Sequence, residues 1–292
     1  MTLPNFVVIG AAKAGTTALY WYLSEHRAVF MSPVKETNFF AYNLDQTGKL
    51  VYGDPDVHRF PVRTLEEYQA LFADAGEATA IGEASPLYLE SPQASGRIAA
   101  LLPDARIVCS LRHPVDRAYS DYLMYLRRRG RHFDPERELT PSAVWAKPDS
   151  RWMQVSRYHD QLARYFEIFP RDRLHVLLFD DIKANALQAT QRVYTFLGVD
   201  PTFVPDLDTP HAAGGIPASH RLEGFLSRSA LIPTLRPWIP ARAANWVRRL
   251  RARSLRKAPS LPGGVRAELT GHFREDIRRT ADLIGRSLDH WL

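Results

Sequence analysis

A glycine-bracketed turn carrying one lysine separates an apolar run from an expected helix near the start of the chain. The run, residues 6–9, is short, continuous and rich in β-branched side chains, as in a strand buried on both faces. Gly10 and Gly15 bracket Lys13, and helical spacing of apolar residues starts at Thr16. Backbone N–H groups and the positive dipole end at such a helix start attract phosphate or sulfate. The turn is therefore predicted to bind an anion.

The turn also resembles, with one displacement, the phosphate loop of nucleotide-dependent kinases. In that loop the lysine follows the second glycine and the next hydroxyl holds magnesium, whereas Lys13 precedes its glycine. The apolar strand 174–179 ends in Asp180 and Asp181, as the magnesium-positioning strand of such kinases ends in an acid. We prefer to interpret one of these acids as the cap of the helix that runs to Gly198. A kinase stays open as the alternative enzyme.

A second apolar strand ends in an arginine, and a helix that begins with proline follows it. Arg112 stands at the end of the strand, Pro114 suits the first helical position, and Ser120 lies about two turns into the helix. A guanidinium can hold a phosphate through two parallel hydrogen bonds, and a hydroxyl can bind another oxygen of the same group. Arg112 and Ser120 are therefore predicted to hold a second phosphate.

Taken together, these motifs resemble the two phosphate-binding signatures of sulfotransferases that use 3′-phosphoadenosine 5′-phosphosulfate (PAPS). Segments 35–40 and 82–88 are similar to the Lys-Glu-x-x-Phe-Phe and Glu-x-[Ser/Thr]-Pro-x-Tyr segments of one branch of that family. This branch includes the heparan-sulfate sulfotransferases and their bacterial relatives, and the likeness continues to the closing segment 283–292. We expect one α/β domain over residues 1–292, with a P-loop-like parallel sheet flanked by helices.

The resemblance implies transfer of a sulfuryl group from PAPS to a hydroxyl or amine, with adenosine 3′,5′-bisphosphate as the other product. Glu36 would be the base that takes the acceptor's proton, while Lys13 and Lys35 would act on the transferring group. His159, next to Tyr158, is the competing base on the substrate side. The residues implied in donor binding are Lys13, Ala14, Gly15, Thr16, Thr17, Arg112 and Ser120. This chemistry requires no metal.

Composition and charge agree with a globular enzyme. Hydrophobic residues make up 45% and charged residues 24%, near the average for such proteins. A net charge of +6 and a pI of about 9.5 suit the binding of a polyanionic nucleotide or an acidic acceptor. The arginine run 127–131 leaves nucleic-acid binding as a third class of function, but no recognised reading motif accompanies it. Nucleic acid is not expected as a partner.

Segment 201–262 is rich in proline and arginine and is expected to be a loop-rich, basic cap on the acceptor side. Within it, residues 236–257 interleave apolar side chains with arginines. Such a pattern could contact an anionic membrane or form a solvated basic face. No apolar run is long enough to cross a bilayer and no leader is evident, which predicts a cytoplasmic protein, peripheral at the inner membrane face if that segment binds lipid.

The acceptor and the oligomeric state are not specified by these patterns. A carbohydrate, a lipid and a small metabolite all fit as acceptors, through either oxygen or nitrogen. Heparan sulfate itself is not expected, because the expected cytoplasmic location departs from the anchored, disulfide-bearing Golgi members of the family. Ala84 also stands where those enzymes have a lysine, which argues against their mode of holding a sulfated polysaccharide. The single cysteine, Cys109, is expected to be a small buried side chain.

Overall fold

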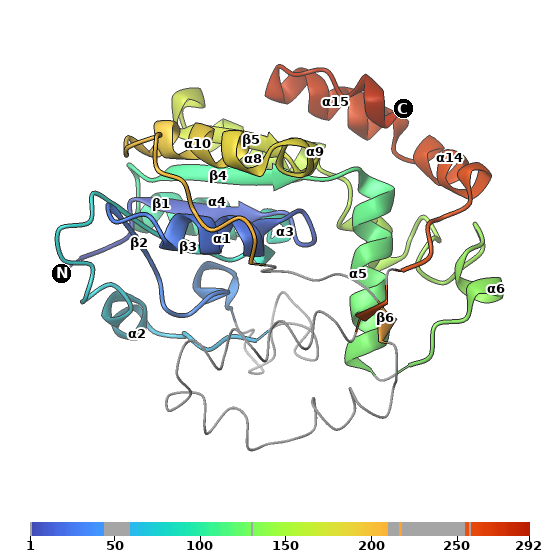
Figure 1. Cartoon of the computed structure of the whole chain (residues 1–292), viewed down its shortest axis with the longest axis horizontal. Coiled ribbons are helices and arrows are strands. Elements are labelled where there is room, and N and C mark those ends of the chain that lie inside the picture. Colours follow the sequence, from blue (N-terminus) through green and yellow to red (C-terminus); the bar gives the residue numbers. More distant parts are fainter. Residues whose placement is uncertain (1, 44–58, 130, 210–215, 218–254, 257) are drawn as a thin grey trace.

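A five-stranded parallel sheet forms the centre of the molecule, in the order β2-β3-β1-β4-β5 (Figure 1). This computed structural model describes residues 2–43, 59–129, 131–209, 216–217, 255–256 and 258–292. The strands of the sheet are β1 (Phe6–Gly10), β2 (Val29–Met31), β3 (Ala80–Ala84), β4 (Arg106–Leu111) and β5 (Leu174–Leu178). The order of the strands reverses direction beside β1, and ligands of such sheets bind beyond the carboxyl ends at that point.

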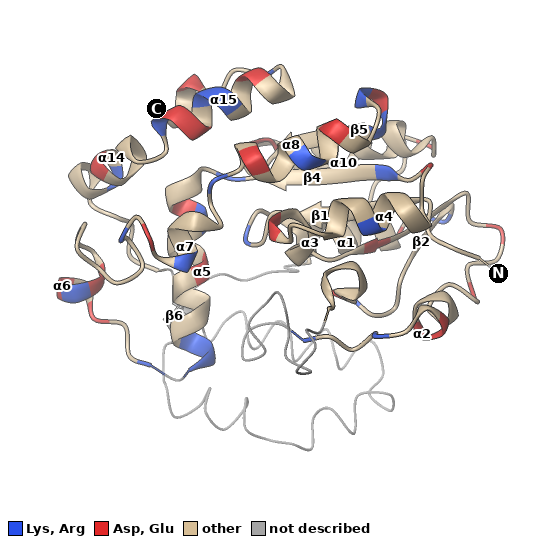
Figure 2. Ribbon diagram, turned by 180° about the vertical axis from the view of Figure 1, so that it is seen from behind, with Lys and Arg blue, Asp and Glu red and all other residues tan. Residues whose placement is uncertain are grey.

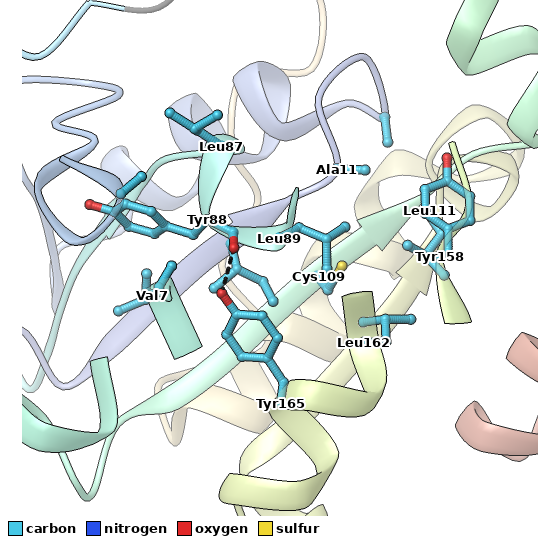
Figure 3. Close-up of a cluster of buried hydrophobic side chains, with 14 of the residues drawn as sticks. Val7, Ala11, Leu87, Tyr88, Leu89, Cys109, Leu111, Tyr158, Leu162 and Tyr165 are labelled. Carbon is cyan, nitrogen blue, oxygen red and sulfur yellow. Dashed lines mark hydrogen bonds between the residues drawn. The ribbon is translucent and has the colours of Figure 1, made fainter. Parts of the chain in front are cut away.

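Helices cover both faces of the sheet, and β1 shows why both faces are apolar. Alternate side chains of a strand point to opposite faces. Phe6 and Val8 pack with α1 (Thr16–Ser24) and α10 (Ala186–Leu197) on one face. Val7 and Ile9 belong to the larger core on the other face, which Figure 3 shows in part. That core contains α3 (Leu87–Glu90), α4 (Ala94–Leu101) and α8 (His159–Ile168).

The remaining elements lie around this three-layer core or beyond its carboxyl edge. Of these, α5 is the longest and stands beyond the end of β4 (Figure 1). Together with α5 (Pro114–Arg128), these elements are η1 (Phe39–Ala41), α2 (Leu65–Ala70), α6 (Pro135–Glu138), α7 (Arg151–Gln154), η2 (Arg171–Arg173), α9 (Phe179–Ala184), the short antiparallel pair β6 (Ile216–Pro217) and β7 (Leu255–Arg256), α14 (Gly263–Gly271), α15 (Arg274–Ile284) and η4 (Asp289–Trp291).

The predicted α/β architecture is confirmed, and so are the start of α1 at Thr16 and that of α5 at Pro114. A capping box at Thr64 opens α2. Among the described residues, no helix is both long and apolar enough to pass through a bilayer. Nearly all of the basic segment 236–257, and most of the expected cap 201–262, lies outside the described residues.

The starts of two helices depend on residues that no local motif identifies. α8 begins at His159, where the Asp276 carboxylate of α15 accepts from the N–H groups of Tyr158 and His159. The acids Asp180 and Asp181 do not precede the helix that runs to Gly198. They lie inside the separate short helix α9, and a different residue, Asn185, caps α10.

Gly82 in β3 is a position where a single methyl group should destabilise the fold. A Cβ there would clash with the ring of Phe6, which is fully buried and cannot move aside. We expect Gly82→Ala to lower the free energy of unfolding by about 1–3 kcal/mol in urea denaturation. The matched control is Gly96→Ala in α4, where a Cβ would meet nothing within 4 Å. It should raise the free energy of unfolding by about 0.4–1 kcal/mol. Equal losses in both variants would show that the contact with Phe6 is not the cause.

Candidate active site

The predicted anion-binding turn leaves β1 at its carboxyl end and leads into α1. Gly15, directly before the helix, has φ 88°, and a Cβ there would come within 2.9 Å of the Phe179 ring. Glycine is therefore required both by the left-handed backbone and by the close approach of that ring. The turn is anchored to the sheet, since the Ser110 hydroxyl of β4 donates to the Ala14 carbonyl at 2.6 Å. The N–H groups at the start of α1 consequently face the region beyond the sheet.

Lys13 projects from this turn into a strongly basic environment. Its Nζ atom lies 3.5 Å from the Met124 sulfur of α5. Burial, together with the neighbouring guanidinium groups of Arg112, Arg127 and Arg128, lowers the pKa of Lys13 to about 8, against the opposing effect of Asp121. The basic end of α5, which includes two of these arginines, is visible in Figure 2. An anion at this position would relieve the repulsion between these cations.

Arg112 is held directly beside the turn. Its guanidinium donates to the Lys13 carbonyl at 3.1 Å and lies 5.0 Å from the centre of the Phe179 ring. The Tyr158 hydroxyl donates to the Arg112 carbonyl at 2.8 Å. The residue is thus oriented by contacts with three other segments, and burial lowers the pKa of its guanidinium. The predicted proximity of the two phosphate motifs follows from the pairing of β1 with β4.

The C-terminal segment packs against His113, the residue that follows Arg112. The buried ring of His113 lies with Nε2 3.0 Å from the Trp291 carbonyl, and burial lowers the pKa of His113 to about 4. The ring is therefore neutral near pH 7 and donates through Nε2 to the carbonyl. The Trp291 indole in turn donates to the Asp180 carboxylate at 2.9 Å. The region around Arg112 is thereby tied to β5, α9 and η4.

One cavity of about 1060 Å³ collects most of the predicted site residues. Its walls include Lys13, Gly15, Thr16, Thr17, Arg112, Ser120 and Glu36. Ala14 is fully buried behind the turn, so its side chain is not part of the wall. The cavity lies beyond the carboxyl ends of the strands, where the topology of the sheet places a ligand.

Glu36 reaches the cavity from a loop that follows β2. Its φ is 62°, and its N–H donates to the Ala84 carbonyl at 3.0 Å, which anchors the loop to the end of β3. The carboxylate is about half exposed and lies 2.7 Å from the Lys35 ammonium. The predicted catalytic pair is therefore an ion pair of which Glu36 lines the cavity, whereas Lys35 is absent from the wall formed by the described residues.

His159 lies apart from this group. It is absent from the cavity wall formed by the described residues, and its Nδ1 atom lies 2.7 Å from the Asp160 carboxylate. At the start of α8, it packs near α15. The structure does not bring this histidine together with Glu36 and Lys13.

Several charged residues of the cavity wall were not predicted from the sequence. Arg266 of α14 pairs with Asp116 at 3.2 Å, and Arg151 of α7 pairs with the Glu90 carboxylate at 3.2 Å. Lys183 of α9 also lines the cavity. Each comes from a segment without a recognisable local motif, and the first pair joins residues 150 positions apart. Only the assembled fold indicates these neighbours.

Comparisons with known proteins agree with this arrangement. Residues 4–203 match the family model described as "Sulfotransferase family". The human bifunctional heparan sulfate N-deacetylase/N-sulfotransferase 2 is 28% identical over 68% of this chain and 22% of its own length. The corresponding Drosophila melanogaster enzyme is 30% identical over 68% of this chain and 20% of its own. This chain thus spans about a fifth of these curated relatives.

A solved structure gives a comparison over the full length. The sulfotransferase from Alicyclobacillus acidocaldarius superposes with a TM-score of 0.71 at 29% identity, covering 100% of this chain and 99% of that one. The predicted sulfotransferase fold is confirmed by this superposition and by the parallel sheet. The roles of individual residues stay predictions.

The environment of Lys13 gives a test that needs no ligand. We expect its ammonium to titrate near pH 8. The titration can be monitored through the ¹³C chemical shift of the Lys13 Cε atom in lysine-labelled protein. Arg128→Gln removes a cation that favours the neutral amine, so it should raise the pKa of Lys13. Arg131→Gln, just beyond the same helix, should leave it unchanged. Titration of Lys13 near 10.5 in the unaltered protein would refute the description of this basic pocket.

Proposed function

The chain belongs to the sulfotransferase family, and from that premise we propose that it transfers a sulfuryl group from PAPS to a hydroxyl or amine. One observation carries the proposal. The turn with Lys13, the Arg112–Ser120 pair and the Glu36 carboxylate converge on a single cavity. In the reaction, the acceptor oxygen or nitrogen bonds to sulfur and the bond from sulfur to the 5′-phosphate oxygen breaks. The products are a sulfate ester or sulfamate and adenosine 3′,5′-bisphosphate.

The donor side of the cavity would stabilise the leaving group. As the bond to sulfur breaks, negative charge grows on the 5′-phosphate oxygen, and donors already aimed at that charge lower the barrier. Lys13 and the N–H groups of residues 15–17 fit this role. Arg112 and Ser120 would hold the 3′-phosphate and orient the donor, which lowers the entropic cost of the reaction. The Phe179 ring, stacked near Arg112, keeps the guanidinium in place.

Glu36 is the base that this geometry favours. Its carboxylate reaches the cavity wall, whereas His159 lies outside the wall and is paired with an acid. The acceptor's proton would pass to a Glu36 oxygen as the new bond to sulfur forms. Lys35, 2.7 Å from that carboxylate, would then be available to contact the transferring sulfuryl oxygens.

The acceptor is proposed only as a class. The names of the curated relatives refer to heparan sulfate, which supports a carbohydrate or similar polyhydroxyl acceptor. Ala84 is fully buried at the end of β3, so no cation projects from the position where the Golgi relatives carry a lysine. For this reason we propose a smaller or less anionic acceptor than heparan sulfate. The cytoplasmic location and a membrane contact through residues 236–257 stay predictions.

The contacts of Asp180 and Asp181, the two acids after β5, favour a sulfotransferase over a magnesium-dependent kinase. The Asp181 carboxylate is gripped by both guanidinium nitrogens of Arg286, at 2.6 and 2.7 Å, and accepts the Leu178 N–H. Asp180 accepts from Trp291 and pairs with Lys183 at 2.8 Å. These contacts give both acids a structural role at the start of α9.

Donor binding is the first function to test. We expect adenosine 3′,5′-bisphosphate to bind without added metal in isothermal titration calorimetry, and more tightly than ATP with magnesium. Arg112→Ala should weaken this binding about 10–100-fold, because a charge-assisted hydrogen bond contributes about 1.5–3 kcal/mol. The matched control is Arg173→Ala, which removes the same charge at the amino end of β5, where Arg173 pairs with Asp104. This variant should bind adenosine 3′,5′-bisphosphate as tightly as the unaltered protein. Preference for magnesium-ATP would instead support the kinase.

Glu36→Gln should separate chemistry from binding. Loss of a positioned general base is expected to lower turnover with PAPS about 10²–10⁴-fold, measured with an acceptor found by screening. The affinity for adenosine 3′,5′-bisphosphate should stay within about twofold of the unaltered enzyme. Glu77→Gln, an exposed site outside the cavity wall, serves as the matched control. Full turnover in Glu36→Gln would show that another group is the base.

A further inference from the structure

A second glutamate near the site, Glu83, is completely buried at the end of β3. One carboxylate oxygen accepts from the hydroxyls of Tyr68 and Tyr88, at 3.0 and 2.7 Å. The other accepts from Thr37 and Ser85, at 2.8 and 2.7 Å. In the part of the chain that the structure describes, no cation forms an ion pair with Glu83. Four hydroxyl groups therefore take the place of water around one buried carboxylate.

One of these hydroxyls belongs to the loop that carries the proposed base. Thr37 stands between Glu36 and Asn38, whose φ angles are 62° and 52°. Left-handed backbone is unfavourable for residues with a Cβ and persists only where surrounding contacts enforce it. Here the loop is bonded to β3 and its continuation at three successive points. These are Glu36 N–H to the Ala84 carbonyl, Thr37 hydroxyl to Glu83, and Asn38 N–H to the Ser85 hydroxyl.

The three bonds form one connected unit around the Glu83 carboxylate. Ser85 donates to Glu83 and accepts from Asn38, so the carboxylate orients the Ser85 hydroxyl toward the loop as well as the Thr37 hydroxyl. The Tyr88 hydroxyl, which also donates to Glu83, lies 2.9 Å from the Thr37 hydroxyl. Burial raises the pKa of Glu83, whereas the four hydroxyl donors favour its ionised form. A neutral side chain there could not accept from all four donors.

We propose that Glu83 is a positioning residue, whose carboxylate holds loop 36–38 in its left-handed conformation and thereby aims the Glu36 carboxylate into the cavity. This inference rests on the proposed function, since it assigns a purpose to the placement of that base. Glu83 itself does not line the cavity and touches no substrate.

The decisive variant is Thr37→Val, which removes the hydroxyl between Glu83 and the loop while preserving the shape of the side chain. We expect kcat to fall about 10–100-fold, because an error of about 1 Å in the position of a catalytic group costs about that much. The KM for PAPS and the Kd for adenosine 3′,5′-bisphosphate should change by less than about twofold. Thr37→Ser restores the hydroxyl and should recover most of kcat. Glu83→Gln should lower kcat by a similar factor if that variant folds. If Glu83→Gln does not fold, the result for Thr37→Val alone decides whether the proposal stands.

Tyr68→Phe is the matched control for a merely structural effect. It removes one donor to Glu83, from a tyrosine hydroxyl that bonds to Glu83 and not to Thr37, and it keeps the ring that stacks on Phe39. We expect a lower Tm with kcat nearly unchanged. Normal kcat in Thr37→Val, or an equal loss of kcat in Tyr68→Phe, would overturn the inference. Failure of the unaltered protein to bind the bisphosphate, or full turnover in Glu36→Gln, would instead overturn the proposed function.

Discussion

The parallel pairing of β1 with β4 is the interaction on which the site depends. It brings the ends of two buried strands together, so that the turn after β1 and Arg112 after β4 meet at one edge. The hydrogen bond from Arg112 to the Lys13 carbonyl and the bond from Ser110 to the Ala14 carbonyl complete this junction. Because both strands are buried on both faces, neither end can move independently of the core. The donor region is therefore anchored to the sheet.

The same junction gathers cations that repel one another. Lys13 is buried close to several arginines, and Asp121 opposes their effect on its pKa. Asp121 is itself engaged by Arg117 at 3.4 Å. A site that holds cations in place before its ligand arrives is preorganised for an anion. Burial is the main cause of the low pKa of Lys13, and the neighbouring guanidinium groups lower it further.

The phosphate-binding part of the site could be predicted because its residues are close together in sequence. A strand, a turn and a helix start place Lys13 by local rules, and the same is true of Arg112 and Pro114. Contacts between distant segments have no such rule. Asp276 of α15 accepts from the N–H groups at the start of α8, and the role of Asp181 depends on Arg286. Glu83 lies inside a recognised motif, yet its four hydroxyl partners only become apparent once β3 and the Thr37 loop are adjacent.

The hydroxyls around Glu83 come from separate parts of the chain. Thr37 belongs to the Lys-Glu segment, Ser85 and Tyr88 belong to the Glu-x-Ser-Pro segment, and Tyr68 comes from α2. These segments therefore form one structural unit. A chimaera that takes the first segment from a relative without the second would leave a buried carboxylate or a buried hydroxyl unmatched. An exchange of the Lys-Glu segment between relatives should accordingly include both segments.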